Sequence, residues 1–171
     1  MSSNRPTDPI DERIRKAKET QKAEADVEAG EHALANEFQR QADKTGREEL
    51  AKIEAMLAAR CQTINANRAE DVPECQYDER RHELRAGKFA LILSLTEGYS
   101  PYFFDMTSGL RSDAAQVFDP DFEPEYEATN WRFFAGMDDN GFFWECDGRR
   151  LSNEEVVEEG LKALANNLVR G

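Results

Sequence analysis

The chain has 171 residues and a mass of 19.5 kDa, which is enough for one medium-sized domain or for a smaller domain with an extension. Its 35 acidic and 22 basic side chains give a net charge of -13, which argues against a surface that binds nucleic-acid phosphates. The longest apolar run, residues 89–93, is far shorter than the roughly 18 residues that a membrane-spanning helix needs.

Neither the N-terminus nor the cysteines indicate secretion. A secretory signal places an apolar stretch after its basic residues, and no such stretch follows Arg5. Three cysteines, Cys61, Cys75 and Cys146, are an odd number at wide spacing, which is not a disulfide framework. We therefore expect a cytoplasmic protein, and the Cys and His spacings predict neither a metal site nor a cofactor.

Residues 1–66 are predicted to form a helical arm. The segment 8–44 has no proline after Pro9 and is rich in the strong helix formers Ala, Glu, Lys, Gln and Arg. Its apolar residues recur at helical spacing and predict a surface for oligomerisation. The expected oligomerisation residues are Ile10, Ile14, Val27, Leu34, Phe38, Leu50, Ile53 and Leu57. Polar residues at Thr20, Gln21 and Glu24 interrupt the apolar stripe, so a long uninterrupted coiled coil is not expected.

The segment Thr45-Gly46-Arg47-Glu48 has the form of a capping box, which predicts a helix end followed by a new helix start. Two arrangements remain open: a helical hairpin that packs the two segments together, or one long bent arm. In both, the apolar stripe is narrow and would gain most from a second chain or from docking on the rest of the protein. A partly frayed helical tail is the alternative.

Residues 67–87 are predicted to be a polar linker that contains Pro73 and ends in a short helix. Asp78 would cap this helix and Gly87 would end it. His82 is then expected on the solvated surface of the helix.

Residues 88–171 are predicted to form an acidic α+β domain, since fifteen of the sixteen aromatic residues are Tyr77 or follow it. Alternating apolar residues predict a strand over 89–96, and shorter strands are expected near 101–106 and 114–118.

The end of this domain has the clearest local signals. The aromatic runs 131–137 and 142–146 flank Asp138-Asp139-Asn140-Gly141, which predicts a β-hairpin, and Asp147-Gly148 predicts a further tight turn. Ser152 and Glu155 form a capping box before an apolar stripe, which predicts a C-terminal helix. We expect four to five antiparallel strands packed by this helix.

Two acidic clusters are the candidate partner-binding sites. They consist of Asp119, Asp121, Phe122, Glu123, Glu125, Tyr126 and Glu127 in a loop, and of Glu154, Glu155, Glu158 and Glu159 on the C-terminal helix. The alternating carboxylates of the loop suit contact with a basic protein, binding of a divalent cation or a catalytic carboxylate pair. A solvated loop without these roles is the alternative.

The chain has no Gly-rich phosphate loop, Gly-x-Ser-x-Gly elbow or His-Glu-x-x-His pair. The sequence therefore predicts a non-catalytic acidic interaction module that self-associates or docks through its N-terminal helices and binds a basic partner protein. No direct contact with nucleic acid or membrane is expected. One alternative is a nucleic-acid-mimicking inhibitor of an enzyme that acts on DNA or RNA. A small carboxylate- or metal-dependent hydrolase is the other.

Overall fold

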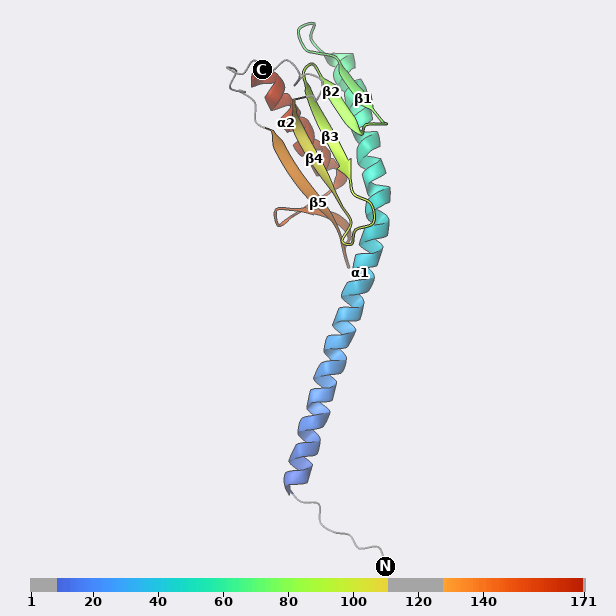
Figure 1. Ribbon diagram of the computed structural model, residues 1–171, viewed down its shortest axis with the longest axis vertical. Coiled ribbons are helices and arrows are strands. Elements are labelled where there is room, and N and C mark those ends of the chain that lie inside the picture. Colours follow the sequence, from blue (N-terminus) through green and yellow to red (C-terminus); the bar gives the residue numbers. More distant parts are fainter. Residues whose placement is uncertain (1–8, 111–127, 171) are drawn as a thin grey trace, which may run out of the picture. The chain divides into compact units, whose positions relative to one another are not determined.

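The computed structural model describes residues 9–110 and 128–170 (Figure 1). Within these residues the chain is α+β, as predicted, but its antiparallel sheet has seven strands rather than four to five. The elements are α1 (Pro9–Asn67), β1 (Cys75–Asp78), β2 (Glu83–Ala86), β3 (Phe89–Leu95), β4 (Phe103–Leu110), β5 (Thr129–Asp138), β6 (Gly141–Cys146), β7 (Arg149–Leu151) and α2 (Asn153–Arg170). Neither described helix is long and apolar enough to cross a membrane. The chain divides into two compact units, Met1–Phe38 and Gln39–Gly171.

The sheet is a meander in which each strand pairs with the next one along the chain. The predicted hairpin is confirmed, because Asp138 pairs with Gly141 across the turn between β5 and β6. Among the residues of that turn only Gly141 has a positive φ, of 111°. In the next turn both Asp147 and Gly148 have a positive φ, the signature of a type I′ hairpin. The expected strand over 114–118 lies outside the described residues.

The short helix expected before Gly87 is wrong, because this segment forms β1, a turn and β2. Cys75 pairs with Ala86 and Tyr77 pairs with Leu84, so the four apolar side chains lie on one face of the hairpin at the period of a strand. His82, in the turn, has a positive φ of 51°. The helical interpretation failed because it gave weight to the cap and stop signals and overlooked this period of two.

The helix break expected at residues 45–48 is also wrong, since α1 is helical from Pro9 to Asn67. The glycine at this point serves packing instead. A Cβ atom on Gly46 would lie 2.7 Å from Cδ1 of Tyr102 and 2.9 Å from Cβ of Ala135. Only a glycine therefore lets the helix backbone approach the sheet this closely.

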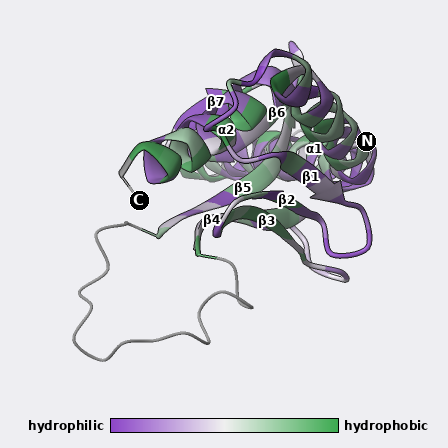
Figure 2. Cartoon of the chain, turned by 90° about the horizontal axis from the view of Figure 1, so that it is seen from above, coloured by the Kyte–Doolittle hydropathy of each residue, from purple (hydrophilic) through white to green (hydrophobic). Residues whose placement is uncertain are grey.

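Both α2 and the Gln39–Asn67 part of α1 pack on one face of the sheet (Figure 2). Gly160 is the close approach of α2, where a Cβ atom would lie 2.8 Å from Cδ2 of Leu91. Trp144 is fully buried at the centre of the core, and its ring meets that of Phe104 edge-on at 4.9 Å. Its indole N–H donates to Asn153 at 2.8 Å, and the amide of Asn153 donates to Glu49 at 2.6 Å, which links β6, α2 and α1.

The predicted capping box at the start of α2 is confirmed. The backbone N–H of Ser152 donates to the Glu155 carboxylate at 2.7 Å, and the backbone N–H of Glu155 donates to the Ser152 hydroxyl at 3.3 Å. The two interactions satisfy N–H groups that the first helical turn leaves without helical partners. Val156, Val157 and Leu164 then face the core.

Candidate functional site

The structure separates the predicted oligomerisation residues into two groups. Leu50, Ile53 and Leu57 are buried in the core of the Gln39–Gly171 unit, which explains their helical spacing without a second chain. Phe38 is half-buried. The four others are exposed on the helix of the Met1–Phe38 unit, with exposed fractions of 64% for Ile10, 48% for Ile14, 62% for Val27 and 57% for Leu34.

The acidic loop over 119–127 lies outside the described residues, so the predicted contributions of Asp119, Asp121, Phe122, Glu123, Glu125, Tyr126 and Glu127 remain predictions. The second acidic cluster is the outer face of α2. Within it, Glu158 accepts a hydrogen bond from Arg60 at 2.8 Å, and Glu159 pairs with Arg149 at 3.2 Å.

Glu155 is engaged in the capping box, whereas Glu154 is exposed one residue before it. Two arginines of the same unit therefore reduce the negative charge of this face, and Glu154 and Glu158 are the members most open to a partner.

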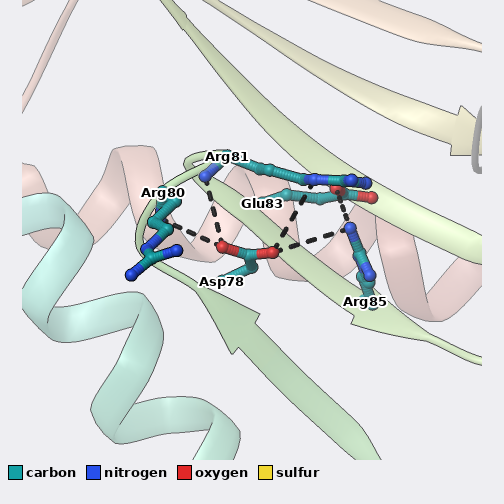
Figure 3. Close-up of polar contacts among 5 residues, drawn as sticks. All are labelled: Asp78, Arg80, Arg81, Glu83 and Arg85. Carbon is teal, nitrogen blue, oxygen red and sulfur yellow. Dashed lines mark hydrogen bonds and ion pairs between the residues drawn. The ribbon is translucent and has the colours of Figure 1, made fainter.

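A polar cluster that the sequence did not predict lies on the β1–β2 hairpin (Figure 3). Asp78 accepts backbone N–H bonds from Arg80 at 3.0 Å and from Arg81 at 3.3 Å, and these bonds hold the turn. Arg85 donates to Glu83 at 2.9 Å and lies 3.7 Å from Asp78. Charges of both signs neutralise each other here, so the cluster suits a structural role in the turn better than recognition of a charged ligand.

A second polar group joins this hairpin to α1. Glu54 on the helix accepts a hydrogen bond from the hydroxyl of Tyr77 at 3.2 Å and also contacts Nδ1 of His82. Burial, together with the charge and hydrogen bond of Glu54, raises the pKa of the Tyr77 hydroxyl well above its usual range. Catalytic sites can also contain a carboxylate that orients an imidazole, but in those sites the imidazole in turn activates a nucleophile. The contact between Glu54 and His82 therefore does not by itself indicate catalysis.

The side chain of Asn65, on α1, forms hydrogen bonds with the backbone of β1, the edge strand of this hairpin. Its amide donates to the carbonyl of Cys75 at 2.7 Å, and its carbonyl accepts the N–H of Cys75 at 2.7 Å. The side chain thus forms the pair of hydrogen bonds that a neighbouring strand would offer to β1. This edge position is thereby closed to pairing with another strand.

The sheet face opposite the helices carries aromatic rings and ion pairs. Arg132 binds Asp105 through two hydrogen bonds of 2.7 and 2.9 Å, and its guanidinium lies 4.4 Å above the Phe103 ring. The hydrogen bond and charge of Arg132 lower the pKa of Asp105. Phe134 packs beside Phe103 at 5.6 Å and is 38% exposed. The alternation of the strands contained this signal, because Phe134 and Arg132 face away from the buried Phe133.

The described part of the chain contains no candidate metal centre. Over residues 9–110 and 128–170, no group of three or more His, Cys, Asp or Glu side chains has the arrangement of a metal site. Cys61, Cys75 and Cys146 are free and buried. Burial, helped by a hydrogen bond with the Cys61 thiol, raises the pKa of Cys75 to about 12, which disfavours the reactive thiolate.

No protein-family model, curated protein or solved structure matches the chain.

Proposed function

We propose that the protein is a non-catalytic interaction module. It self-associates through the helix of the Met1–Phe38 unit, and its acidic α+β domain binds a basic partner protein. The observation that carries the proposal is the exposure of Ile10, Ile14, Val27 and Leu34 on this helix.

Most helical stability in proteins comes from packing of an apolar face, and residues 12–36 of this helix are all exposed within the single chain. Full burial of a Val, Leu or Ile side chain contributes about 1.5–3 kcal/mol. A second helix that covered the four exposed side chains would therefore stabilise both helices. A hydrophobic core can cover such residues within one chain, as the core of the Gln39–Gly171 unit does for Leu50 and Ile53.

Self-association is tested by sedimentation of the full chain against a variant that lacks residues 1–38. The deletion ends at Phe38 because the following part of α1 belongs to the second compact unit. We expect the full chain to form an oligomer and the shortened chain to be a folded monomer. A full chain that remains a monomer at every concentration would contradict the proposal.

A matched pair of variants separates apolar contact from helix propensity. Val27→Ser with Leu34→Ser removes two exposed apolar side chains, whereas Ala29→Ser with Ala33→Ser makes a larger loss of helix propensity at exposed positions of the same helix. The first pair should weaken self-association and the second should leave it nearly unchanged. Equal effects would indicate that only helix stability matters.

Partner binding is tested by capture of proteins on the full chain followed by elution in rising salt. Complementary charge makes association salt-dependent, so Glu154→Gln with Glu158→Gln should elute a basic partner at lower salt. Displacement of the partner by DNA would favour the nucleic-acid mimic instead. A partner that is retained equally by wild type and variant would exclude the α2 face as its binding site.

A further inference from the structure

The charges on the helix of the Met1–Phe38 unit are segregated along its length. Residues 13–22 carry five basic side chains and one acidic side chain, whereas residues 23–38 carry five acidic side chains and no Lys or Arg. The basic members are Arg13, Arg15, Lys16, Lys18 and Lys22, and the acidic members of the second segment are Glu24, Asp26, Glu28, Glu31 and Glu37. Residues 12–36 are all exposed, so both segments are presented to solvent.

Four of the five large apolar residues of this helix fit one heptad frame, and Ile14 lies one position outside it. Positions 10, 17, 24, 31 and 38 form one seam position, and positions 13, 20, 27 and 34 form the other. Ile10, Ala17, Val27, Leu34 and Phe38 are the apolar members of the frame. Its polar members are Arg13, Thr20, Glu24 and Glu31.

We propose that two copies of this helix pair in antiparallel orientation, with the basic segment of each copy against the acidic segment of the other. This proposal rests on the self-association proposed above and names the partner as a second copy of the chain. The two-fold axis crosses the pair at the level of residue 22, so seam residues whose numbers are equally far from 22 on either side face each other. Ile10 then faces Leu34, and Ala17 faces Val27.

The polar seam positions explain the orientation. About the same axis, Arg13 faces Glu31 of the second copy, and Thr20, whose hydroxyl donates to the carbonyl of Lys16 at 3.0 Å, faces Glu24. No charged seam residue therefore meets a like charge. In a parallel pair in register, Arg13, Glu24 and Glu31 would each face the same residue of the other copy. Like charges at a helix seam are costly, so this arrangement is disfavoured. Lys22 lies five positions after the seam residue Ala17, on the side of the helix away from the seam, so the two Lys22 side chains do not meet in the pair.

Disulfide capture in the full chain tests the orientation. Ile10→Cys and Leu34→Cys chains are prepared separately, then oxidised mildly either alone or as an equal mixture. The dimer is measured on a non-reducing gel, with the unsubstituted chain as background for its three buried cysteines. The mixture should give a crosslinked dimer. Each variant alone should give none, since the two copies of position 10 would lie about 36 Å apart along the pair.

A crosslink in I10C alone, with none in the mixture beyond that product, would overturn the antiparallel orientation and leave self-association standing. A chain that sediments as a monomer in every sample would overturn the self-association itself. Sedimentation of each variant under reducing conditions shows whether the cysteine has weakened the pair.

Charge exchange gives a second, independent measurement. Arg13→Glu should weaken dimerisation at least about tenfold, because it places two like-charged contacts in the pair, one at each end. Arg13→Glu combined with Glu31→Arg should restore dimerisation, since the opposite charges face each other again. Failure of the double exchange to restore the pair would overturn the proposed register.

Discussion

Replacement of Gly46 by alanine should destabilise the Gln39–Gly171 unit, although alanine is the better helix former. Helix propensity alone would favour the substitution by about 1 kcal/mol. The added methyl group, however, would lie 2.7 Å from Cδ1 of Tyr102 and 2.9 Å from Cβ of Ala135. Real Cβ atoms do not approach other carbon atoms this closely, so the helix, the ring or the strand must move.

None of these neighbours can move without cost. Tyr102 is 4% exposed, its carbonyl accepts the N–H of Ala135 at 2.8 Å, and the carboxylate of Asp43 accepts its N–H at 2.8 Å. The Cβ atom of Ala135 is fixed by the backbone of a central strand. Overpacking of a tightly packed core costs about 1–3 kcal/mol. Subtraction of the gain in propensity leaves a net loss of about 0–2 kcal/mol in the free energy of unfolding, and the restraints on these neighbours place the expected value near the upper end.

Urea unfolding measures this loss through the fluorescence of Trp131 and the buried Trp144, with far-UV circular dichroism as a second signal. Gly30→Ala is the matched control, because Gly30 lies in the same helix with open space around it. That variant should increase helicity without any loss of domain stability. A double-mutant cycle with Ala135→Gly should show a favourable coupling between the two sites. A G46A variant as stable as the wild type would refute the packing argument.

Three further substitutions or conditions test the remaining contacts. Asn65→Ala should cost about 1–3 kcal/mol in urea unfolding because both backbone groups of Cys75 lose their partner, whereas Asn67→Ala, which removes an exposed bond to Thr63, should cost less than about 0.5 kcal/mol. Burial would raise the pKa of Asp43, but hydrogen bonds from Ser100, Tyr102 and Gln39 outweigh it and lower the pKa, so stability should fall as the pH drops below about 4. The urea midpoint of Asp43→Asn should depend less on pH in this range than that of the wild type, with Asp105 supplying part of the remaining dependence. The raised pKa of Cys75 keeps its thiol neutral in the folded state, whereas the thiol of the unfolded chain ionises above about pH 8.5, so stability should fall as the pH rises beyond that value. A thiol reagent should also label the folded chain far more slowly than the urea-unfolded chain. Equal labelling rates would contradict the burial of the thiols.

Local signals in the sequence were sufficient where one backbone requirement decides the structure. The capping box of Ser152 and Glu155 and the turn at Asp147-Gly148 each depend on a few adjacent residues, and both are confirmed. The same kind of signal failed at Gly46 and in the segment that ends at Gly87. In both places a glycine was interpreted as the end of a helix. The need for glycine at position 46 instead comes from close contacts with Tyr102 and Ala135, which lie more than fifty residues later in the chain.

The candidate site shows the same limit at the level of a surface. Leu50, Ile53 and Leu57 repeat at helical spacing and are buried, whereas Val27 and Leu34 repeat along the same helix and are exposed. Periodicity specifies which face of a helix is apolar, but it does not specify what covers that face. Contacts with the sheet cover the first group within one chain.

For the second group, the charges supply the information that periodicity lacks. Five basic residues followed by five acidic residues along one exposed helix complement the same helix in reverse, which is a property of the sequence independent of the apolar pattern. If salt screening weakens self-association and the exchange of Arg13 with Glu31 leaves it intact, charge determines the orientation of the pair while the apolar residues supply its stability. Self-association that is unaffected by salt would assign both roles to the apolar contacts alone.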